Sequence, residues 1–259
     1  MTHHHTAPVR PRFAGTRYPR LAEIPAFTEF IASGWDDVAV HPTLPAGTAA
    51  AAASHRARLS AALPGKTLVV AAGAAPIRND DAAYGFRAHS SFVWLTGCQV
   101  EGALLVMWPA AGGHDAVLYL PRPFRPGDAG FFSDAAHGEL WVGPSARLPE
   151  WSDELQVTVE PLESLEVRHA DLRGAQAARS AAPLATTAGA SVSPELERTL
   201  SRLRMVKDEW EITQLRAAVD ATVGGFAAVV AEVPRANADG LGERWLQGTF
   251  DRPARTVGN

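Results

Sequence analysis

Carboxylate and imidazole side chains gather in one glycine-containing segment, which makes that segment the first candidate for a reaction centre. Asp128, Asp134 and His137 lie close together in the chain, beside Gly127 and Gly130. A site for Mn²⁺ or a similar ion needs several such ligands converging from a rigid framework. Glycine and aspartate next to each other are instead typical of turns. We therefore expect a surface turn here and assign no metal ligand.

Other common reaction centres are missing from the sequence. It has no Gly-x-Ser-x-Gly turn, no His-Glu-x-x-His motif and no glycine-rich loop of the phosphate-binding kind. The single cysteine, Cys98, has no histidine near it in the chain, so we expect a small buried residue rather than a nucleophile. One cysteine also excludes an intrachain disulfide framework. We therefore predict no catalytic residue in this span.

Three polar or amphipathic side chains within the segment 84–108, those of Arg87, His89 and Trp94, could contact a ligand. Trp94 is expected in the core, with its indole N–H bound to a backbone acceptor. Arg87 is expected to pair with Asp80 or Asp81 just upstream. The alternative places all three side chains at a rim that contacts a substrate or another subunit.

Composition limits the class of protein. The chain has 259 residues, of which 46% are hydrophobic and 20% charged, with a net charge of −4. These values are ordinary for a soluble globular protein of one large or two modest domains. A net charge of −4 gives no sign of the basic surface that nucleic-acid binding needs. No apolar run appears long enough to span a bilayer, and no secretory signal is recognisable. We expect a cytoplasmic protein without a membrane or nucleic-acid partner.

The elements that position these residues are predicted from apolar patterning. Phe92–Leu95 and Leu104–Met107 are continuous apolar runs that predict two central strands joined by a tight connection. Further strands are predicted at 67–72, 116–120, 139–142 and 157–159, and helices at 26–31, 48–63, 149–155 and 162–184.

The composition changes near residue 191, where a second, helical part of the chain is predicted to begin. A helix is predicted from Pro194 to about Arg204. Asp208 and Glu211 have capping-box spacing before a long apolar stripe that Pro234 ends, and a short helix follows at 241–250. The stripe needs cover, from a longer parent chain or from a partner. The predicted organisation is an extended arm with a short helix at 1–47, a first domain at 48–190 and an incomplete second domain at 191–259.

Several blocks of the sequence resemble aminopeptidase P (Xaa-Pro aminopeptidase), a member of the creatinase and prolidase superfamily. The segments 79–87 and 92–97, with Glu101, are similar to its N-terminal domain, as is 139–143. The segment 202–212 is similar to the start of its catalytic domain. The resemblance implies an α/β fold: a creatinase-like domain with a mixed β-sheet flanked by helices, followed by the opening helices of a pita-bread domain.

The resemblance also implies a function. Such a hydrolase removes the N-terminal residue of a peptide with proline at the second position, using two divalent metal ions, typically Mn²⁺. The family's ligands (two Asp, one His and two Glu) all lie downstream of the matching segment, so none is carried over to this span. The span is expected to supply structure, oligomer contacts in a dimer or tetramer, and access to the active site, and to be inactive alone.

The family often has an aromatic residue at the position of Val93, in a loop that approaches a neighbouring subunit. Here the bulk is at Trp94, so Arg87, Val93 and Trp94 are the candidates for substrate access or subunit contact. Two other functions stay open: a catalytically inactive creatinase-fold module that binds peptides or acts as a scaffold, and a creatinase or prolidase.

Overall fold

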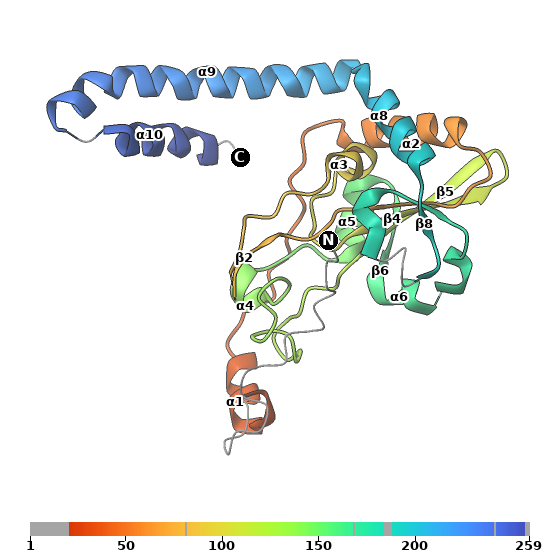
Figure 1. Ribbon diagram of the computed structural model, residues 1–259. Helices are drawn as coiled ribbons and strands as arrows, with labels where there is room; N and C mark the ends of the chain where they lie inside the picture. Colours follow the sequence, from red (N-terminus) through yellow and green to blue (C-terminus); the bar gives the residue numbers. More distant parts are fainter. Residues whose placement is uncertain (1–20, 81, 168, 184–187, 241, 257–259) are drawn as a thin grey trace. The chain divides into compact units, whose positions relative to one another are not determined.

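The computed structural model describes residues 21–80, 82–167, 169–183, 188–240 and 242–256, and the predicted arm at 1–20 lies outside them. The chain forms two compact units that divide between Glu197 and Arg198 (Figure 1). Each unit is described by itself.

The first unit is built on a six-stranded mixed sheet, which confirms the predicted α/β class. The strand order is β6-β5-β4-β1-β7-β8. The bounds are β1 (Leu68–Ala71), β4 (Leu104–Ala110), β5 (Gly113–Leu120), β6 (Thr158–Pro161), β7 (Gln176–Ala177) and β8 (Ser191–Val192). β4 pairs antiparallel with β1 and β5, and the remaining pairs are parallel.

Helices cover both faces of this sheet. Val106 pairs with Val69 on one side and Val117 on the other, and these side chains pack with Leu165 of α6 (Leu162–Val167) in one core cluster. On the opposite face lies α2 (Thr48–Ala62), which contacts β5 (Figure 1). The continuous apolar run in β4 is buried because both faces of the sheet are covered, as predicted.

Two predicted strands are helices. Residues Phe92–Leu95 lie in α3 (Ser90–Thr96), and Glu139–Val142 forms α4. α3 begins where the ring of His89 accepts a hydrogen bond from the backbone N–H of Ser91, and it ends at Gly97, whose φ is +75°. A short apolar run has no period that separates a buried helix from a buried strand, so these capping contacts decide.

The predicted helix at 162–184 is also largely wrong. α6 is helical as expected and so are Ala182 and Pro183, but between them the chain forms η2 (His169–Leu172), strand β7 and η3 (Arg179–Ala181). β7 joins the sheet beside β1, where the backbone N–H of Gln176 donates to the carbonyl of Thr67 at 2.8 Å. Sheet pairing therefore overrides the local helical pattern.

The other elements of the first unit are short. They are η1 (Leu21–Glu23), α1 (Pro25–Ala32), α5 (Leu148–Leu155) and a separate hairpin of β2 (Ile77–Asn79) and β3 (Ala82–Ala83). The helical turn before residue 155 and the edge strand after it are confirmed by α5 and β6.

The second unit is helical. α8 (Pro194–Met205) crosses the division, and α9 (Glu209–Ala238) and α10 (Gly242–Thr256) follow. The predicted capping box of α9 is present, because Asp208 and Glu211 each bond the other's backbone N–H. The predicted stop at Pro234 is wrong: proline removes one N–H donor, but the helix continues and Asp239 N–H donates to the Arg235 carbonyl.

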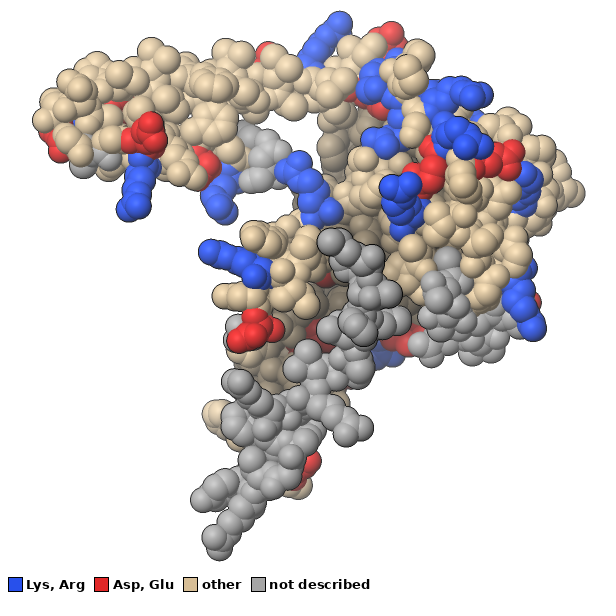
Figure 2. Space-filling view, viewed as in Figure 1, with Lys and Arg blue, Asp and Glu red and all other residues tan. Residues whose placement is uncertain are grey.

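α9 packs on α10 and leaves much of its apolar stripe exposed. Phe226 and Phe250 lie with ring centroids 5.2 Å apart, and Trp245 donates to Glu232 at 2.7 Å. Val223 and Val230 remain 62% and 69% exposed. Figure 2 shows few charged side chains along the visible side of α9.

By length and composition, α9 is the one helix in the described part of the chain that could cross a membrane. The expectation that no run approaches that length is therefore wrong. Helices that pack inside soluble proteins satisfy the same two criteria, so length and composition alone do not assign this helix to a membrane.

Candidate functional site

The predicted site residues lie on and just before α3. Trp94 is buried, Val93 is half-buried and Arg87 is exposed. Consecutive residues on a helix point about 100° apart, so Val93 and Trp94 face different directions without being opposed as they would be in a strand. The segment therefore brings Trp94 into the core and leaves Arg87 outside it.

Trp94 is held by α2, a contact that the sequence analysis missed. The imidazole of His55 stacks on its indole with centroids 4.2 Å apart, and His55 Nδ1 lies 2.7 Å from the Trp94 carbonyl oxygen. Arg58 lies 5.4 Å from the ring centroid. The expected backbone acceptor for the indole is absent: within the described residues, Nε1 is buried without a partner. The signal available in the sequence was that His55 and Arg58 are three residues apart, which places them on one side of the helix predicted at 48–63.

The C-terminal end of α3 is also fixed by α2. Arg56 Nη1 donates to the Leu95 carbonyl at 2.8 Å, placing positive charge at the end where the helix dipole is negative. A Cβ added at Gly97 would lie 2.2 Å from Thr48 Cγ2. α2 and α3 are therefore joined by the Arg56 hydrogen bond and by the close approach of the Gly97 backbone to the Thr48 side chain.

The predicted ion pair between Arg87 and Asp80 is absent, because no carboxylate of the described residues lies within 4.0 Å of the Arg87 guanidinium. Asp81 lies outside them. The assignment of Arg87, Val93 and Trp94 to substrate access or subunit contact stays a prediction.

The carboxylates of the glycine-containing segment act as turn caps. Asp128 Oδ2 accepts from the Arg125 backbone N–H at 2.7 Å, and Asp134 Oδ1 accepts from the N–H groups of Ala136 and His137. Over its described residues, neither unit taken alone brings three metal-ligating side chains together. These side chains do not fit a metal centre, so no chemical step is assigned to a metal held by them.

A charged network surrounds the same loop. Asp37 accepts from Arg147 and from Arg125 Nη1, and Arg125 Nε lies 3.6 Å from Glu139 Oε1. The hydrogen bond from Arg147, followed by its charge, lowers the pKa of Asp37 below its ordinary value. The network ties the segment before α2 to the loop after β5.

Cys98 follows α3 and is buried, as expected. Burial raises the pKa of its thiol to about 12, so the thiolate needed for nucleophilic chemistry is scarce at neutral pH.

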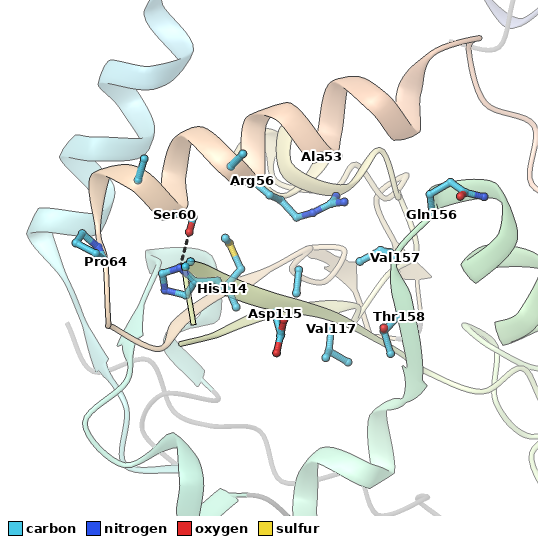
Figure 3. A pocket seen from close by; sticks show the side chains of 16 residues that line it. Ala53, Arg56, Ser60, Pro64, His114, Asp115, Val117, Gln156, Val157 and Thr158 are labelled. Atoms are coloured by element: carbon cyan, nitrogen blue, oxygen red, sulfur yellow. Dashed lines mark hydrogen bonds between the residues drawn. The ribbon is translucent and has the colours of Figure 1, made fainter. Parts of the chain in front are cut away.

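A cleft of about 810 Å³ opens between α2, the β4–β5 hairpin and the start of β6 (Figure 3). We call it the α2–β5 cleft. On one side Ser60 Oγ lies 2.8 Å from His114 Nδ1, and His114 Nε2 lies 2.7 Å from the Lys66 carbonyl oxygen. Because a carbonyl can only accept, His114 donates from Nε2 to Lys66, and Nδ1 is left to bond Ser60. Sequence spacing gave no sign of this cleft.

Comparison with known sequences connects this architecture to one family. Residues 52–179 match the family described as "Aminopeptidase P, N-terminal domain". The chain is 43% identical over 253 residues to Xaa-Pro aminopeptidase 2 of Streptomyces coelicolor, covering 93% of this chain and 52% of that protein. It is 39% identical over 260 residues to Xaa-Pro aminopeptidase 1 of the same organism, covering 97% and 51%. The chain spans about half the length of these curated relatives.

Solved structures show the same fold. An aminopeptidase P described as putative, from Bacillus anthracis, superposes with a TM-score of 0.63 at 18% identity, covering 82% of this chain and 52% of that one. Aminopeptidase P from E. coli also gives 0.63, at 19% identity, covering 81% and 50%.

Proposed function

Residues 52–179 belong to the aminopeptidase P N-terminal domain family, and on that premise we propose that this chain forms part of a proline-specific metallo-aminopeptidase. The whole protein would remove the N-terminal residue of a peptide whose second residue is proline. The observation that carries the proposal is the 43% identity to a Xaa-Pro aminopeptidase across 93% of this chain.

The role of this span in that enzyme is structural. Asp128 and Asp134 cap turns, Asp37 pairs with Arg125 and Arg147, and Cys98 is a buried thiol. These contacts support a scaffold that shapes access to a reaction centre built from other residues. The expectation that the span is inactive alone rests on the family's metal ligands, which lie downstream of the matching segment.

Membership of the aminopeptidase P family implies divalent metal ions, and we propose Mn²⁺ for the whole protein. Two such ions supply a nucleophilic water at neutral pH and stabilise negative charge on the scissile carbonyl. No residue described above is assigned to hold them. We further propose a cytoplasmic homo-oligomer, in keeping with a single reduced cysteine.

The test compares this chain with a fusion to the remaining half of the S. coelicolor relative. Hydrolysis of a Xaa-Pro peptide is measured with added Mn²⁺. The fusion should release the first residue, and the chain alone should release none. A peptide with alanine at the second position is the specificity control.

Turnover by the chain alone would contradict the assigned role. A folded fusion that binds Mn²⁺ but leaves the Xaa-Pro peptide intact would instead favour the inactive peptide-binding module.

A further inference from the structure

The α2–β5 cleft contains a cation that lacks an anion. Arg56 is 8% exposed, and its Nη1 donates to the Leu95 carbonyl. In the described part of the chain no carboxylate lies within 4.0 Å of this guanidinium. A buried charge without a counter-ion is costly, and a carbonyl partner satisfies only one of five N–H donors.

The guanidinium faces the cleft. Figure 3 shows the Arg56 side chain extending from α2 into the space on the side where Val157 lies. Arg56 and Val157 both line the cleft. The donors that Leu95 does not use are therefore available to a group inside it.

The shape of the cleft comes from small side chains on one face of α2. Ala53, Ala57 and Ala61 recur at intervals of four, line the cleft and are exposed. Residues four apart stack along one side of a helix, so three methyl groups leave a channel there. Met107 of β4 adds an apolar contact on the opposite side of the cleft. An apolar body of a few carbon atoms fits such a channel.

From these observations we propose that the α2–β5 cleft binds a compact organic monocarboxylate, with its carboxylate paired to Arg56 and its apolar body along the alanines of α2. A guanidinium presents two parallel donors that match a carboxylate. The alanine methyl groups of α2 offer no donor to the further oxygens of a dianion such as phosphate, so a monocarboxylate with an apolar body fits the cleft better. The proposal does not depend on peptidase activity.

The test is an NMR titration of the 259-residue chain, following the backbone amides of β5. The probes are 4-methylpentanoate, its neutral analogue 4-methylpentanamide, and inorganic phosphate. The acid should shift the amides saturably and bind about tenfold tighter than the amide, the difference that one charge-assisted hydrogen bond supplies. Phosphate should bind more weakly than the acid.

Two variants of α2 form a matched pair. Ala57→Phe fills the cleft and should abolish the titration, whereas Ala50→Phe, at an exposed position of α2 outside the lining, should leave it unchanged. Arg56→Lys keeps the charge but loses the planar fork, so it should weaken acid binding and leave the amide unaffected. The proposal is overturned if acid and amide bind equally, if phosphate binds tighter, or if no β5 amide titrates.

Discussion

The imidazole of His55 and the indole of Trp94 lie nearly parallel, with 9° between their planes and 4.2 Å between their centroids. His55 also contacts the carbonyl of the same tryptophan, so one residue of α2 holds both the side chain and the backbone of α3. The two helices therefore behave as one packed layer over the sheet.

Removing this stack should destabilise the first unit. Trp94→Ala leaves a cavity beside His55 and should lower the free energy of unfolding by about 3–5 kcal/mol. Trp94→Phe keeps an aromatic ring and removes the buried Nε1–H that has no partner among the described residues, so it should cost less than about 1.5 kcal/mol. Urea unfolding measures both. Equal losses for the two variants would show that ring packing is unimportant.

Two glycines with similar backbone angles should respond differently to alanine. Gly97 and Gly73 have φ of +75° and +89°, so each alanine variant carries left-handed strain of about 1–2 kcal/mol. Only at Gly97 does an added Cβ meet a neighbour, at 2.2 Å from Thr48, whereas Gly73 has nothing within 4 Å. Gly97→Ala should lower the free energy of unfolding by about 1–3 kcal/mol more than Gly73→Ala. Matching losses would contradict the close approach of α2 and α3.

Neighbouring glycines in α9 offer a second pair. Gly224 has open space around it, so Gly224→Ala should stabilise the helix by up to about 1 kcal/mol. A Cβ at Gly225 would lie 2.8 Å from the Phe250 ring, which must then move. We expect Gly225→Ala to lose that benefit and to lower the thermal midpoint relative to Gly224→Ala. The reverse order would mean that α10 does not pack at Gly225.

The pairing of Asp37 with Arg147 and Arg125 should make stability depend on pH. The folded-state pKa of Asp37 is lowered below 3.8, so its contribution is present above that value and is lost as pH falls through the folded pKa. Asp37→Asn should therefore lower the urea midpoint at neutral pH and have no effect in strong acid.

The effect of Asp37 should be small and sensitive to salt, because its carboxylate is 72% exposed. Adding NaCl to about 0.5 M should remove most of the difference between wild type and Asp37→Asn. A difference that persists in salt would point to packing instead of charge.

Cys98 should be protected from thiol reagents in the folded state. Its pKa of about 12 and its burial both suppress the thiolate, and as the single cysteine it gives an unambiguous signal. The reaction with a disulfide reagent at neutral pH should be slow in buffer and fast in concentrated urea. Fast labelling in buffer would show that the segment between α3 and β4 opens readily.

By itself, the sequence determined the class of the fold, the central place of the run in β4, the capped start of α9 and the resemblance to aminopeptidase P. Each of these conclusions rests on a pattern of neighbouring residues. The pattern is a continuous apolar run for β4, a capping box for α9, and a set of motifs in the same order for the resemblance. The tertiary structure alone decided that residues 90–96 are helical and that residues 176–177 join the sheet. It also decided that Arg56, far from β5 in the chain, shares a cleft with it. Contacts between distant segments settle these points, and short apolar runs or isolated charges carry no periodic signal from which such contacts can be predicted.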